Sequence, residues 1–83
     1  MKVKVLFFGA TADLTRKRQA EIEITEDAVA ANVLEQIFAE FPSLVKHHDK
    51  KSLLFSINQE YSSGDEKIKE GDELAIFTAV SGG

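Results

Sequence analysis

The order in which hydrophobic patterns follow one another constrains this chain most. One stretch repeats apolar residues at four-residue spacing, at Val29, Val33, Ile37 and Phe41, which is typical of a helix with one buried face. Segments with alternating apolar residues, typical of strands, stand on both sides of it, two before and two after. A lone helix can bury its stripe only against the sheet that such strands form. The order therefore predicts an α+β fold.

The expected elements follow from these patterns. We expect strands at residues 1–8, 18–24, 53–58 and 74–78, a helix from Asp27 to Phe41, and one further turn at residues 43–47. Thr25 or Asp27 is suited to cap the helix, and Pro42 ends it at Phe41. Residues 9–17 follow neither period and are expected to form a loop. The prediction is a mixed sheet of four to five strands with one main helix across one face.

The first strand carries apolar residues on both sides. Val3, Val5 and Phe7 share one face, which we expect to be buried under the helix. Leu6 and Phe8 belong to the other face. A strand that is apolar on both sides is typical of the centre of a sheet, so we expect its second face to be partly covered as well.

Composition excludes several classes of function. The 83 residues are 43% hydrophobic, enough for one domain spanning residues 1–83. The absence of cysteine excludes a disulfide scaffold, a thiolate zinc site and a cysteine nucleophile, and it suits a reducing compartment, so we expect a cytoplasmic protein. The longest run without a charge, residues 74–83, is far shorter than the roughly 20 residues of a membrane helix. A net charge of −4 argues against nucleic-acid binding.

The end of the chain is the one place where the sequence points to chemistry. No hydrolase triad, phosphate-binding loop or set of metal ligands stands elsewhere, and we expect no metal and no bound cofactor. Residues 79–83 follow the last strand as a tail, and when extended they reach about 17 Å. Because Gly82 and Gly83 lack Cβ atoms, they can pass a narrow channel and place a carboxylate in the active site of another protein. The alternative is an ordinary flexible end.

Three segments give the chain a resemblance to a known family. They are Lys4-Val5-Leu6-Phe7-Phe8, Ile57-Asn58-Gln59-Glu60-Tyr61, and Gly71-Asp72-Glu73 followed by Val80-Ser81-Gly82-Gly83. In this order they resemble the small subunit of molybdopterin synthase, the MoaD family of ubiquitin-like sulfur carriers. The resemblance spans essentially the whole chain and implies a β-grasp fold. One departure lies at Thr78-Ala79, where the family usually has two prolines.

The resemblance implies a mechanism in which this chain is not catalytic alone. An adenylating enzyme of the ubiquitin-activating type would consume ATP to activate Gly83, and a sulfur donor would convert it to a thiocarboxylate. The large synthase subunit would accept the tail, with Gly82 beside the reacting end, and use the sulfur to build the molybdopterin dithiolene. The residues implied to contact this partner are Phe77, Val80 and Ser81.

Other interpretations stay open at this point. Phe77 could instead be an ordinary core residue, because phenylalanine side chains are mostly buried. A thiamine-type sulfur carrier shares the fold and the tail, although those chains tend to be shorter and lack the Asn-Gln-Glu segment. A ubiquitin-like modifier would join Gly83 to lysines of other proteins. A β-grasp binding module would use no terminal chemistry and would tolerate the loss of both glycines.

Overall fold

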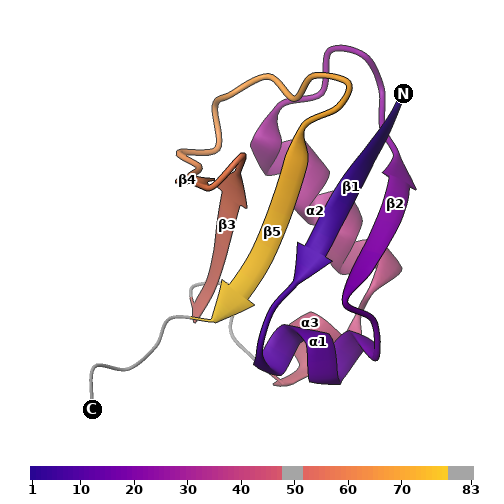
Figure 1. Ribbon diagram of the computed structural model, residues 1–83, viewed down its shortest axis with the longest axis vertical. Helices are drawn as coiled ribbons and strands as arrows, with labels where there is room; N and C mark the ends of the chain where they lie inside the picture. The colour runs from indigo at the N-terminus through magenta and orange to yellow at the C-terminus, as the bar shows by residue number, and fades with distance from the viewer. Residues whose placement is uncertain (48–51, 79–83) are drawn as a thin grey trace.

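The computed structural model describes residues 1–47 and 52–78, which form a five-stranded mixed sheet with helices on one side and at one end (Figure 1). The strand order is β2-β1-β5-β3-β4, and every neighbouring pair is antiparallel except β1 and β5, which run parallel. In chain order the elements are β1 (Lys2–Phe7), α1 (Ala10–Thr15), β2 (Gln19–Glu23), α2 (Ala30–Glu40), α3 (Ser43–His47), β3 (Leu53–Ile57), β4 (Glu60–Tyr61) and β5 (Glu73–Thr78). The predicted α+β class and the four longer strands are confirmed.

Helix α2 crosses one face of the sheet and closes the core. Val33 and Ile37, from its apolar stripe, are essentially inaccessible to solvent, as predicted. They pack with the inward side chains of β1, Val3, Val5 and Phe7, within one cluster of buried residues. The ring of Phe7 also meets that of Phe41 edge-on, with centroids 5.1 Å apart. None of the helices among the described residues is long and apolar enough to span a membrane.

The start of α2 differs from the prediction. The helix begins at Ala30 with Val29 as its N-cap, and neither Thr25 nor Asp27 caps it. Its first amide groups instead donate to carbonyls of a distant loop: Ala30 N to Glu66 O at 2.8 Å and Ala31 N to Gly64 O at 3.0 Å. The free amide groups of a helix end need acceptors, and here residues 64–66 supply them in place of a side-chain cap. The predicted start at Asp27 is therefore wrong by three residues.

The predicted loop at residues 9–17 contains a helix, α1, so that prediction is wrong. Gly9 turns the chain from β1 into α1 at φ +55°, which a residue with a side chain rarely adopts. The fully buried Thr11 then anchors α1, because its hydroxyl lies 2.7 Å from Phe8 O and 2.9 Å from Ile76 O. A helix of six residues gains little from its own hydrogen bonds and depends on such tertiary contacts. The hydroxyl thereby links α1 to the ends of both β1 and β5.

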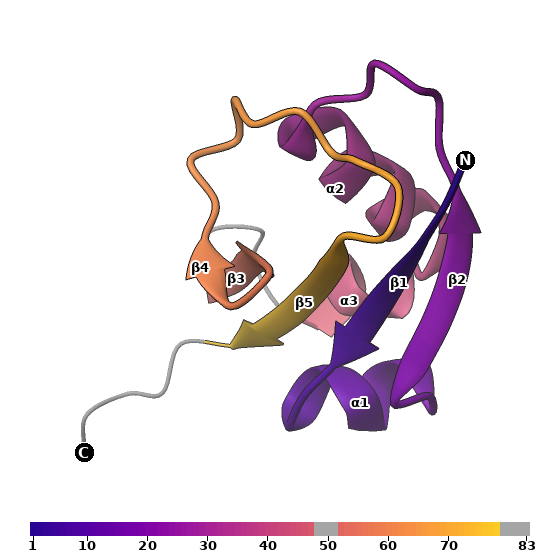
Figure 2. The same cartoon turned by 45° about the horizontal axis from the view of Figure 1, so that its top comes forward.

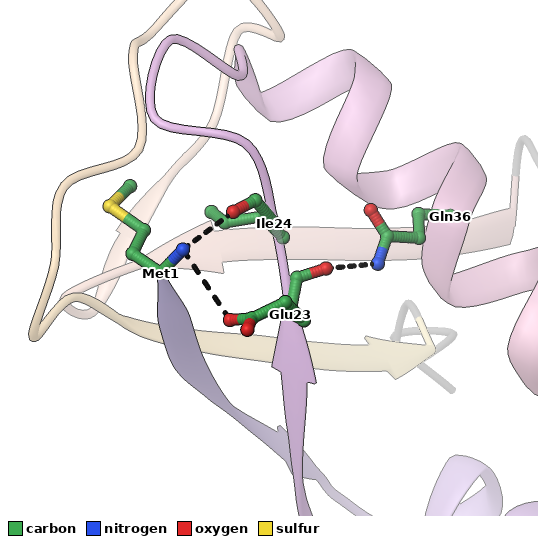
Figure 3. A network of polar contacts seen from close by, with 4 residues as sticks. All are labelled: Met1, Glu23, Ile24 and Gln36. Carbon is green, nitrogen blue, oxygen red and sulfur yellow. Dashed lines mark hydrogen bonds and ion pairs between the residues drawn. The ribbon is translucent and has the colours of Figure 1, made fainter.

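The amino-terminal end of the chain is fixed to β2 and α2 (Figure 3). The Met1 ammonium donates to Ile24 O at 2.8 Å and lies 3.4 Å from a carboxylate oxygen of Glu23. The Glu23 carbonyl accepts a hydrogen bond from the Gln36 side-chain amide of α2 at 2.6 Å. These contacts connect the outer strand β2 with both its neighbour β1 and the helix above the sheet.

The loop that caps α2 is organised by one carboxylate. Glu66 accepts hydrogen bonds from the Ser62 hydroxyl at 2.8 Å, from Ser63 N at 3.0 Å and from Gly64 N at 3.0 Å. These donors, the Ser63 amide first among them, lower the pKa of Glu66 from 4.5 to about 2. The ionised carboxylate therefore holds the loop in the shape that presents Gly64 O and Glu66 O to the helix.

The Glu66 carboxylate makes the stability of the folded chain depend on pH, and this dependence can be measured. Because the pKa of Glu66 is lower in the folded chain than in the unfolded chain, its stabilising contribution is present above about pH 5 and is lost as the pH falls toward 2. Replacing Ser62 by Ala removes the hydroxyl donor and should raise the Glu66 pKa in an NMR titration. Ser63→Ala is the matched control, because Ser63 donates through its backbone amide. Equal Glu66 titration midpoints in both variants would contradict this account.

Candidate functional site

The face of the sheet opposite α2 is the candidate site. Within residues 1–47 and 52–78 no helix crosses this face, which is turned toward the viewer in Figure 1. Its two ends differ in chemistry. Toward the start of β1, Lys2 lies opposite Glu23, and Lys4 stands between Glu21 of β2 and Glu73 of β5. This end is polar and suited to contact with water.

The other end of this open face is apolar. It forms a shallow hollow of about 290 Å³, and the apolar residues that line it come from β1 and its end, β4 and β5: Leu6, Phe8, Tyr61, Ala75 and Phe77. We call these five residues the apolar patch. Tyr61 is 72% exposed and Phe8 is 52% exposed, although large hydrophobic side chains are usually buried. An exposed group of aromatic side chains on a small domain is a candidate surface for contact with another molecule.

Aromatic contacts and a neighbouring hairpin hold the patch in place. The rings of Tyr61 and Phe77 lie 5.9 Å apart between centroids. Tyr61 stands on the short strand β4, where it pairs with Ser56 of β3. Phe77 pairs with Leu54 of β3, whereas Leu74 and Ile76 lie on the core side of β5. The patch is therefore built on the sheet, with Phe8 directly after the end of β1.

The prediction that β1 is a central strand, partly covered on its second face, is confirmed at Leu6, which is partly buried, but Phe8 just beyond the strand is largely open. Leu6 and Phe8 do lie on that face, but more than half of the Phe8 side chain is exposed. Alternation along a strand shows which residues share a face, but a covering element has to come from another part of the chain or from another molecule. Phe77 is partly exposed and does not belong to the core cluster. Its contact with a partner stays a prediction.

The patch lies at the place where the tail begins. Thr78 is the last described residue, and it ends β5 opposite Leu53 of β3. Phe8, Gly9, Phe77 and Thr78 line a second hollow at this end of the sheet. Figure 2 shows β1 and β5 running side by side to the same edge, next to α1. The other predicted site residues, Val80, Ser81, Gly82 and Gly83, lie outside the described residues.

Sequence reasoning singled out Phe77 but missed Phe8 and Tyr61 as its neighbours on the surface. Parallel pairing places Phe7 beside Ile76, so the next residues of both strands, Phe8 and Phe77, come to the same end of the sheet. That register cannot be read from either strand alone. For Tyr61, the local signal was weak: Asn58 suits the first position of a tight hairpin turn, but Gln59 stands where glycine usually follows it.

The strand order, together with helix α2 across one face of the sheet, defines a ubiquitin-like β-grasp domain, and solved structures of that class superpose on it. The small archaeal modifier protein 1 of Haloferax volcanii matches with a TM-score of 0.87 and 25% identity over the full length of both chains. A putative molybdopterin converting factor subunit 1 from Pyrococcus furiosus matches with a TM-score of 0.84 and 27% identity, covering 96% of this chain and 99% of the other.

Sequence comparison gives the family. The chain belongs to the ThiS family, whose model matches residues 5–83. Among curated relatives, the molybdopterin synthase sulfur carrier subunit of Chlamydomonas reinhardtii is 34% identical over 85 residues, and the alignment covers all of both chains. The predicted resemblance to the small subunit of molybdopterin synthase is confirmed.

The exposure of Phe77 makes a prediction about stability. Phe77→Ala should lower the free energy of unfolding by less than about 1.5 kcal/mol, because the ring is partly exposed before the change. Ile76→Ala, one residue earlier and fully buried, should lower it by about 2–5 kcal/mol. Urea unfolding of both variants measures the difference. A loss at Phe77 as large as the loss at Ile76 would show that Phe77 belongs to the core.

Proposed function

We propose that this chain is the sulfur carrier subunit of a molybdopterin synthase and delivers sulfur from a thiocarboxylate at Gly83. The observation that carries the proposal is the apolar patch at the root of a tail that ends in two glycines. The patch offers a docking surface, and the tail can extend from it into the active site of the docked partner. Curated relatives named molybdopterin synthase sulfur carrier subunit support the same assignment. The chain lacks cysteine, which suits work in the cytoplasm.

The terminal carboxylate needs activation before it can carry sulfur. A carboxylate at the end of a chain is ionised at neutral pH and is a poor electrophile. In the proposed sequence a Gly83 carboxylate oxygen attacks the α-phosphorus of ATP on an adenylating enzyme of the ubiquitin-activating type. Pyrophosphate leaves, and an acyl adenylate forms. A sulfur donor then supplies sulfide, which displaces AMP and gives the thiocarboxylate. All catalytic side chains belong to the partners in this scheme.

The large synthase subunit is the second partner. It accepts the thiocarboxylate, whose sulfur forms a new bond to carbon of the substrate; hydrolysis by water returns the tail to a carboxylate, and two such transfers supply the two sulfur atoms of the molybdopterin dithiolene. The proposed contacts are the patch residue Phe77 together with Val80 and Ser81 of the tail. Burying exposed aromatic side chains supplies most of the affinity in many protein interfaces, while the polar end of the open face can stay hydrated.

A second candidate function is supported by one comparison. The Haloferax volcanii neighbour carries the name modifier protein, and a modifier would join its terminal carboxylate to lysine amines. Both functions need an activated Gly83, so activation alone does not separate them. A tagged chain expressed in its native cells would appear in conjugates of higher mass if it is a modifier. Denaturing electrophoresis followed by mass spectrometry of Gly83-linked lysine peptides detects such conjugates.

The terminal chemistry predicts a strict requirement for the position of Gly83. Adding one residue moves the carboxylate by about 3.3–3.6 Å, whereas misplacement of about 1 Å can already lower a rate on the order of 100-fold. Deleting Gly83, or adding one alanine after it, should abolish sulfur loading without changing the thermal unfolding curve. The measurement is the mass of the C-terminal peptide after incubation with the adenylating enzyme, ATP and a sulfur donor. Loading of both variants at the native rate would contradict the thiocarboxylate mechanism.

The docking surface makes a separate prediction. Phe77→Ala should weaken binding to the purified large subunit by at least about 10-fold, which corresponds to about 1.4 kcal/mol. Asn32→Ala, an exposed position on α2, is the control and should bind as the native chain does. Isothermal titration calorimetry measures both affinities. If Phe77→Ala binds like the control, the apolar patch is not the docking surface.

A further inference from the structure

The hairpin between β3 and β4 holds two residues in left-handed backbone conformations. Asn58 has φ +50° and Gln59 has φ +72°. Two consecutive positive values are characteristic of the two-residue turn whose second position strongly favours glycine. Here that position is occupied by glutamine, a residue that adopts positive φ only against a steric cost.

The first of these residues is explained by its contacts. The Asn58 side-chain amide donates to Asp72 Oδ1 at 3.0 Å, and its carbonyl oxygen accepts from Glu73 N at 3.0 Å. Its backbone amide also donates to Glu73 O at 2.8 Å. Asparagine tolerates the left-handed region well, and in this position it joins the hairpin to the start of β5. These contacts stabilise the fold, and they explain why asparagine occupies a left-handed position at residue 58.

No comparable contribution to the stability of the fold explains why glutamine occupies the left-handed position at residue 59. Its side chain is exposed, and no hydrogen bond within residues 1–47 and 52–78 involves its carboxamide. Glycine would adopt the same backbone conformation without steric cost. A strained residue whose carboxamide has no hydrogen bond to the described part of its own domain points to a role in contact with another molecule.

The location of Gln59 indicates what that role is. Gln59 lines the hollow of about 290 Å³ together with the apolar patch residues Tyr61 and Phe77. It is therefore a polar group beside a cluster of exposed apolar groups. Protein interfaces are commonly built in this way, with an apolar centre and hydrogen-bonding groups around it. A carboxamide offers both donors and an acceptor and carries no charge to desolvate, so it complements a main-chain peptide group.

We infer that Gln59 is a specificity residue of the docking surface, whose carboxamide hydrogen-bonds a main-chain peptide group of the large subunit beside the apolar patch. This inference rests on the proposed function, since it takes the large subunit as the partner. Natural selection for binding then explains a residue that costs the free domain stability.

Two substitutions separate binding from stability. Gln59→Gly removes the carboxamide and relieves the backbone, so the midpoint of thermal unfolding should rise by about 3–8 °C while affinity for the purified large subunit falls about 5- to 10-fold. Gln59→Glu keeps the shape and the backbone strain but removes the amide donors. It should leave the unfolding midpoint nearly unchanged and lower the affinity to a similar extent. Calorimetric titration and thermal unfolding are measured on the full-length chain.

A third variant, Tyr61→Ala, distinguishes failure of this inference from failure of the proposed function. If Tyr61→Ala weakens binding while both Gln59 variants bind within twofold of the native chain, the role of Gln59 is refuted and the docking surface stands. If Tyr61→Ala also binds like the native chain, the docking surface itself is refuted. A fall in the unfolding midpoint of Gln59→Gly would show that Gln59 supports the fold, which overturns the inference as well.

Discussion

The parallel pairing of β1 with β5 is the constraint on which the rest of the structure depends. Their register runs from Lys4 opposite Glu73 to Phe7 opposite Ile76. Parallel neighbours cannot be joined by a tight turn, so the chain between them has to cross a face of the sheet, and α2 lies in that crossing. Both strands end at the same edge, where Phe8 N donates to Ile76 O. The pairing thus places Phe8 and Phe77 together at the root of the tail.

Alternation along these two strands places the core residues and the apolar patch residues on opposite faces of the sheet. Phe7 and Ile76 point toward α2 and are buried, whereas Phe8 and Phe77, each one residue later, belong to the open face. Side chains on a strand alternate strictly between faces, so a slip of one residue would exchange the two sets. The same pairing that fixes the core therefore fixes the composition of the apolar patch, the proposed docking surface. A partner can bind that surface without disturbing the contacts under α2.

The sequence predicted the parts of the fold that follow a local period. The longer strands and α2 were recognisable because their apolar residues repeat, as at Val33 and Ile37. Helix α1 and strand β4 were missed, since six residues and two residues are too few to show a period. The start of α2 was misplaced because its acceptors, such as Glu66 O, come from far along the chain. Long-range contacts of this kind leave no local pattern.

The candidate site was only partly predictable for the same reason. The terminal Gly82-Gly83 pair is visible in the sequence, and resemblance to a family of sulfur carriers attached a chemistry to it. The surface that would present this tail is assembled from β1, β4 and β5, with Tyr61 and Phe77 brought within ring contact by pairing through β3. Neither that assembly nor the strained backbone at Gln59 follows from local sequence.

Mapping the contact with the large subunit by NMR tests the central claim most directly. The claim is that the open face docks the partner and that α2 does not take part. On addition of the purified large subunit to the isotope-labelled chain, the account predicts amide shift changes at Phe8, Tyr61 and Phe77 and at the tail. It predicts no comparable changes at exposed α2 positions such as Asn32. Shift changes centred on α2, with those of the apolar patch unaffected, would contradict the account.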